Sequence, residues 1–178
     1  GTLNFTDPNY DFMGNSINYY FSSSTNDKSN QGYENKLTST GINTGFEQYK
    51  DVFISLGLSA TYDDLKTEST ASKSLKSQAG AFTEVAANYG FALDKRDRSF
   101  QPTEGSIVSF RQSLPVYADK SFIENTFKTS LFNSFSDDEV IGAAKFSLTS
   151  VHGLNDDDVR LSKRKSLSTR RLRGFEKG

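Results

Sequence analysis

Apolar and polar residues alternate with a period of two along most of this chain, over stretches longer than most strands of soluble proteins. In the clearest run, Val52 to Tyr62, every second residue is apolar and most of the others are Ser, Gly or Thr. Similar runs lie at 85–93 and 140–149. Because successive side chains of a strand point to opposite faces, each run predicts a strand with one apolar and one polar face.

This periodicity predicts an all-β fold. No helical period of 3.6 residues and no capping box separates the strands, so we expect an antiparallel meander without crossover helices. The expected strands lie at about 1–6, 15–26, 32–46, 50–66, 79–97, 105–117, 121–136 and 139–155, followed by a long loop at 156–178.

Charged residues fall on the polar face of the expected strands. Glu124 and Lys128, for example, lie opposite Ile123, Phe127 and Leu131. This arrangement suits a transmembrane β-barrel, because Lys or Arg facing lipid at the bilayer midplane costs about 2–4 kcal/mol, whereas a wet lumen accepts it at little cost. A half-exposed sheet of a soluble protein predicts the same alternation, so this pattern leaves both possibilities open.

The amino-acid composition excludes several classes of protein. Hydrophobic residues make up only 34% of the chain, yet 15 Phe and 8 Tyr are too many aromatic residues for a disordered protein. The net charge of -1 gives no overall attraction to nucleic acid. Without cysteine there is no disulfide framework and no thiolate metal site. No apolar run approaches the roughly 18 residues of a transmembrane helix.

Long connections fall mostly on alternate links between the expected strands. By this parity the basic loop 156–178 lies at the same end of the sheet as the long link 67–78. Short turns at one end and long loops at the other are typical of outer-membrane barrels. The short link 116–121 fits this scheme less well.

No catalytic constellation is present in the sequence. The single histidine, His152, has no second His or Cys as a companion, so we expect an exposed polar residue. The cluster Asp156-Asp157-Asp158 lacks the ligand spacing of a calcium loop, which favours a solvated loop. The sequence therefore predicts that the protein is not an enzyme and uses no metal and no cofactor.

Three motifs follow one another along the chain: Asp7-Pro8-Asn9 with Gly14, the turn Asp97-Arg98-Ser99-Phe100-Gln101-Pro102-Thr103-Glu104-Gly105, and Arg173-Gly174-Phe175. Together they resemble the barrel domain of the BamA-type outer-membrane assembly factors of the bacterial surface antigen family. The resemblance covers essentially the whole chain.

The turn motif is expected to be structural. Pro102 supplies a restricted backbone and Gly105 a permissive one at the chain reversal, and Asp97 pairs with Arg98 in our interpretation. The turn residues that we single out are Asp97, Arg98, Pro102, Thr103 and Gly105.

The resemblance implies that this chain is a section of a larger barrel, about eight of sixteen strands, without the periplasmic POTRA domains and the remaining strands. We therefore expect a curved open sheet with two unpaired edges. The implied location is the bacterial outer membrane, and the implied function is insertion and folding of other β-barrel proteins. The implied partners are the lipid bilayer, nascent barrel proteins and, through the absent periplasmic domains, accessory lipoproteins; nucleic acid is not among them.

The resemblance also places Arg173, Gly174 and Phe175 at the tip of an external loop that folds back into the lumen. Arg173 would bind acidic or aromatic groups on strands beyond Gly178, because a guanidinium forms paired hydrogen bonds with a carboxylate that Lys does not reproduce. Gly174 lets the backbone approach the wall, and Phe175 adds apolar contact. On charge alone, a solvated or nucleic-acid-binding tail is the alternative, and a plain turn with an anchoring aromatic residue is another.

Other functions remain open at this point. A two-partner secretion transporter or a TamA-like transporter shares the barrel and an Arg-containing loop. A plain diffusion barrel and a soluble β-sandwich binding module are the alternatives from other classes. A sandwich would pack its apolar faces together in a dry interior, whereas a membrane barrel would expose them.

Overall fold

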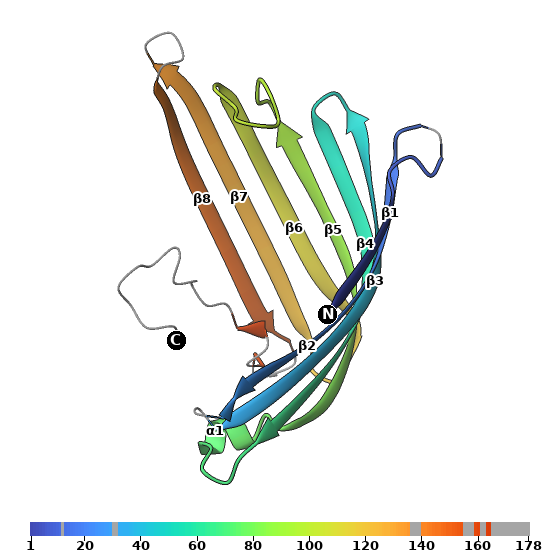
Figure 1. Ribbon diagram of the computed structural model, residues 1–178, viewed down its shortest axis with the longest axis vertical. Coiled ribbons are helices and arrows are strands. Elements are labelled where there is room, and N and C mark those ends of the chain that lie inside the picture. The colour runs from blue at the N-terminus through green and yellow to red at the C-terminus, as the bar shows by residue number, and fades with distance from the viewer. Residues whose placement is uncertain (12, 30–31, 136–139, 155–158, 161–162, 165–178) are drawn as a thin grey trace.

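The computed structural model describes residues 1–11, 13–29, 32–135, 140–154, 159–160 and 163–164. They form one antiparallel sheet of eight strands in chain order, as expected for a meander (Figure 1). The strands are β1 (Thr2–Asp7), β2 (Ser16–Lys28), β3 (Tyr33–Tyr49), β4 (Val52–Thr67), β5 (Gly80–Asp94), β6 (Gly105–Ala118), β7 (Phe122–Phe135) and β8 (Val140–Gly153).

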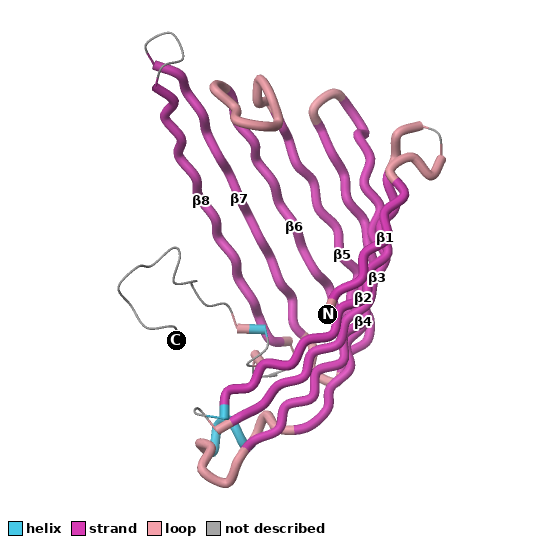
Figure 2. The backbone as a smooth tube through the Cα atoms, viewed as in Figure 1, coloured by secondary structure: helices cyan, strands magenta, loops and turns pink. Residues whose placement is uncertain are grey.

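The sheet is strongly curved but open. β1 and β8 each have a single hydrogen-bonded neighbour and lie at opposite edges of the curve (Figure 2). This confirms the expected all-β fold and the open sheet with two edges. The links 68–79 and 119–121 lie at one end of the sheet together with the start of the basic loop, and the turn 95–104 lies at the other end (Figure 1).

The strand register keeps the apolar series together on one face. Ile54 lies opposite Phe91, which in turn lies opposite Phe110, so one apolar row crosses β4, β5 and β6. These side chains are not buried in a core, since Leu58 and Phe91 are each 52% exposed. Among the described residues, no side chain is completely buried. The exposed apolar face contradicts the packed interior of a soluble β-sandwich.

The opposite face is polar and concave. Residues 159–160 and 163–164 lie within the curve of the sheet (Figure 1) and contact the face that carries Asp63 and Glu84. Small residues dominate this face in the middle of β4 and β5, for example Ser55, Gly57 and Gly90.

Two local features differ from the expected elements. The link between β4 and β5 contains a short helix, α1 (Lys73–Lys76), capped by the Ser72 hydroxyl. A single helical turn is too short to show a helical period, which is why the sequence pattern missed it. β3 continues to Tyr49 through an irregularity in its pairing with β4 between Glu47 and Tyr49. Within the described residues, no helix has the length and apolar character needed to cross a membrane.

Candidate functional site

The start of the basic loop is attached to the concave face by Arg160. Its Nε donates a hydrogen bond to Asp63 Oδ2 at 3.1 Å, and the two side chains are only 6% and 7% exposed. The guanidinium carbon lies 3.4 Å from the centre of the Phe82 ring. Asn35 donates to the other Asp63 oxygen. The guanidinium is thus held by a charge and an aromatic face at once.

The strand register explains why Asp63 and Phe82 lie together around Arg160. Leu37, Asp63 and Phe82 are direct neighbours across β3, β4 and β5, and all three point to the concave face. Burial lowers the pKa of Arg160 below its usual value, and the neighbouring Asp63 carboxylate opposes this effect. The guanidinium still remains charged, because arginine does not lose its proton in proteins.

Lys163 provides a second attachment one step along the sheet. Its Nζ lies 2.5 Å from Glu84 Oε1, and Glu84 follows Phe82 on the same face of β5. The backbone N–H of Lys163 donates to the Arg160 carbonyl at 3.0 Å, so a single turn separates the two cations. The described part of the basic loop is therefore bound to the wall by two ion pairs. We name Arg160, Asp63, Lys163 and Glu84 the loop anchor.

The sequence did not reveal this pairing. In the sequence, Arg160 and Lys163 are two of several cations in the basic loop 156–178, and Asp63 lies 97 residues before Arg160. The period of two places Asp63 on the polar face with Thr61, which is the one available signal. Arg173, Gly174, Phe175 and the cluster 156–158 lie outside the described residues. His152 lies on β8 and is exposed.

The expected turn motif forms a compact unit around the Asp97 carboxylate. Asp97 Oδ1 accepts the backbone N–H groups of Thr103 and Glu104 at 3.0 and 3.2 Å, and Oδ2 accepts the Thr103 hydroxyl at 2.8 Å. Arg98 Nε pairs with Oδ2 at 3.0 Å. Desolvation acts to raise the pKa of Asp97, but these hydrogen bonds outweigh it and hold the pKa well below its usual range.

The backbone of the turn depends on its Pro and Gly residues. Gln101 has a φ of 48° directly before Pro102, and Gly105 has a φ of 98°. A Cβ atom at Gly105 would lie 2.1 Å from the Lys95 carbonyl oxygen, so only glycine fits. Every contact of these side chains that we describe is within the turn.

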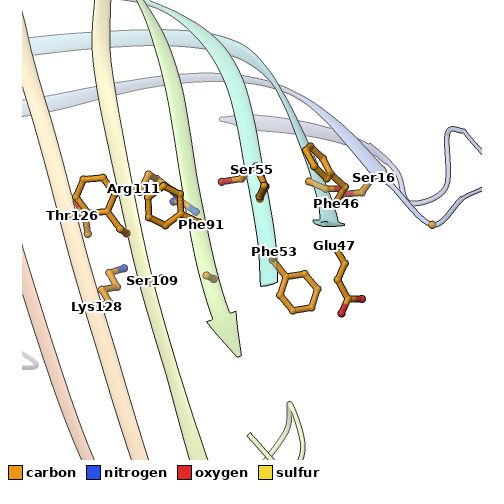
Figure 3. Close-up of a pocket in the computed structure, with 15 residues that line it drawn as sticks. Ser16, Phe46, Glu47, Phe53, Ser55, Phe91, Ser109, Arg111, Thr126 and Lys128 are labelled. Carbon is orange, nitrogen blue, oxygen red and sulfur yellow. The ribbon is translucent and has the colours of Figure 1, made fainter. Parts of the chain in front are cut away.

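A hollow of about 500 Å³ lies in the concave face, nearer the end of the sheet that carries the turn 95–104 (Figure 3). Arg111 and Lys128 border it on the side of β6 and β7, and Glu47 and Phe53 border it on the side of β3 and β4. A smaller hollow of about 200 Å³ continues from Arg111 toward the loop anchor.

Comparisons with known proteins give one family match and one match in fold. The family model described as "Omp85 superfamily domain" matches residues 1–178, the whole chain. The crystal structure of BamA from Haemophilus ducreyi lacking POTRA domains 1–3 is similar to this chain with a TM-score of 0.75 and 19% sequence identity. The match covers 93% of this chain and 35% of that one, so the chain spans about a third of the BamA structure. No curated protein sequence matches this chain.

Proposed function

This chain belongs to the Omp85 superfamily, and from that premise we propose that it is a section of the outer-membrane barrel of a BamA-like insertase that folds other barrel proteins into the membrane. The single observation that carries the proposal beyond family membership is the loop anchor, in which a basic loop enters the concave face of an open sheet. A loop held inside the curve belongs to a plugged barrel better than to an open pore.

The dimensions of the apolar face support a membrane location. On β4 the apolar series runs from Val52 to Tyr62, which is 11 residues in the printed sequence. A tilted strand crosses the hydrocarbon core with about 9–11 residues. Beyond Tyr62 the same face carries Asp64 and Lys66, where the strand would leave the lipid.

We assign the end of the sheet with α1 and the loop anchor to the outside of the cell, and the end with the turn 95–104 to the periplasm. The support is that β2, β3 and β4 extend past the apolar band at the α1 end, where Glu34, Lys36 and Lys66 meet water. In this orientation the loop 156–178 is external at its base and folds into the lumen.

In such an insertase, this section would supply wall and loop rather than the seam where substrates enter. A substrate strand would pair with an exposed strand edge of the seam, because main-chain groups in lipid need hydrogen-bond partners. The proposed role is not enzymatic. Accessory lipoproteins would bind the periplasmic domains of the complete protein.

The test is an insertion measurement with the complete protein in liposomes. We expect it to speed the folding of several unrelated unfolded barrel substrates, scored by protection from protease. Liposomes with a plain diffusion barrel of similar size are the control. Acceleration of one cognate exported protein alone would instead identify a secretion transporter, and no acceleration would refute the insertase.

The same measurement tests whether Arg173 holds the loop 156–178 inside the lumen, an arrangement that we call the loop lock. We expect Arg173→Ala to impair barrel assembly more than Arg170→Ala, because the paired hydrogen bonds of the Arg173 fork would be lost. Arg170 is the matched control, since it is an arginine of the same basic run. Equal and negligible effects of the two substitutions would contradict the lock.

A further inference from the structure

The hollow near the 95–104 end of the concave face lies outside the loop anchor. Small residues form part of its lining: Gly45 lies opposite Ser55, and Ser55 lies opposite Gly90 at the margin of the hollow. A Cβ atom at Gly90 would lie 2.8 Å from the Phe110 carbonyl oxygen and 3.1 Å from Ser55 Oγ. The volume of about 500 Å³ therefore depends on these small side chains, and it falls within the range of ligand sites.

The wall on the β6 and β7 side is cationic. Arg111 lies opposite Thr126, and Lys128 follows Thr126 on the same face of β7, so the two cations are diagonal neighbours. In the described part of the chain, neither Arg111 nor Lys128 has a hydrogen bond or an ion pair. Like charges on adjacent strands repel each other, and an anion between them would relieve this repulsion.

Other cations of the same face are already engaged. Arg160 and Lys163 bind carboxylates in the loop anchor, and Lys145 lies 5.9 Å from the centre of the Phe132 ring. The two cations of the hollow also have hydroxyl groups beside them, from Ser109 and Thr126 (Figure 3). This combination of a guanidinium, an ammonium and hydroxyl donors is suited to a carboxylate.

The opposite wall limits which anion fits. Glu47 and Phe53 are paired neighbours on β3 and β4 and line the same hollow. Four strand spacings separate β3 from β7, about 19 Å measured along the curved sheet, and the hollow between these walls accommodates an extended polypeptide. A glutamate at the far wall repels a small dianion, but it can accept a hydrogen bond from a peptide N–H. The Phe53 ring adds apolar contact.

We propose that this hollow binds an acidic side chain of an unfolded polypeptide that enters the lumen, with the carboxylate on Arg111 and Lys128. The inference rests on the proposed function, since it names the kind of substrate segment that the barrel section would contact. A polypeptide is favoured over a lipid phosphate because Arg111 and Lys128 belong to the polar face of their strands, opposite to the apolar series that lipid would cover.

The test uses the complete protein in detergent and a fluorescent peptide rich in Asp and Glu, with an isosteric Asn/Gln peptide as reference. We expect the acidic peptide to bind more tightly. Lys128→Gln should weaken its binding about tenfold, as expected for one charge-assisted hydrogen bond. Lys145→Gln, which removes one charge from the same face outside the hollow, should change it less than twofold. Lys128→Arg should retain binding.

Several results would overturn the inference: equal binding of both peptides, equal effects of Lys128→Gln and Lys145→Gln, or displacement of the peptide by inorganic phosphate at equal concentration. Thermal unfolding of each variant checks that the barrel is intact, and the Arg111→Gln variant provides a second measurement if Lys128→Gln is unstable. Insertion into liposomes is measured in parallel. Insertion without selective peptide binding refutes the site alone, whereas selective binding without insertion refutes the insertase and leaves the site.

Discussion

The attachment of the basic loop to the sheet depends on single side chains, and Asp63, which pairs with Arg160, is the first to test. Asp63→Ala would leave the Arg160 guanidinium buried without the carboxylate that pairs with it. Breaking a buried ion pair in this way lowers the free energy of unfolding by about 3 kcal/mol. We expect the loop to detach and to become cleavable by trypsin in the folded barrel. Asp64→Ala is the matched control, because the next residue points to the opposite face. Equal protection in both variants would contradict the anchor.

The turn around Asp97 should respond to acid in a defined direction. Its pKa is depressed in the folded protein, so its hydrogen bonds stabilise the turn fully above the unfolded value of about 4, and this stabilisation is lost as the pH falls from there through the depressed folded pKa. We expect the amide resonances of Thr103 and Glu104 to titrate together, with a midpoint below the usual aspartate range. Asp97→Asn should abolish the titration. A midpoint at the usual value would contradict the hydrogen-bonded carboxylate.

Strand pairing depends on close approach at Gly41 of β3. A Cβ atom there would lie 2.6 Å from Tyr20 Cε1 and 2.7 Å from the Leu58 carbonyl oxygen. Gly41→Ala must therefore displace β2 or β4, and we expect a loss of about 1–3 kcal/mol, the usual cost of overpacking. The measurement is the urea midpoint of the complete barrel in detergent.

The control for this substitution lies on the same strand and face. At Gly45 the nearest atoms to a new Cβ are Ser16 Oγ at 3.5 Å and the Ile54 carbonyl oxygen at 3.9 Å, which is ordinary contact. Gly45→Ala should therefore leave the midpoint nearly unchanged. A similar loss in both variants would mean that the backbone freedom of glycine, rather than the Tyr20 contact, determines the effect.

At the scale of elements, the alternating pattern was sufficient to predict every strand and the meander, because neighbours in sequence pair in space. It could not predict α1, which is too short to show a period. It also could not predict the loop anchor or the hollow. The pair of Asp63 and Arg160 joins residues 97 apart, and the hollow depends on the register of six strands, β2 to β7, which a pattern within one strand does not contain.

At the scale of the whole molecule, the two edge strands β1 and β8 determine whether the chain associates with other chains. Unpaired strand edges present rows of N–H and C=O groups that pair with other chains, and β1 and β8 are such edges. We expect the isolated 178-residue chain to fold into sheet in detergent but to self-associate, with a mass in sedimentation that rises with concentration. The complete barrel, in which further strands cover both edges, should remain monomeric under the same conditions. A monomeric isolated chain at all concentrations would show that its edges are protected by the chain itself, which would contradict an open section of a larger barrel.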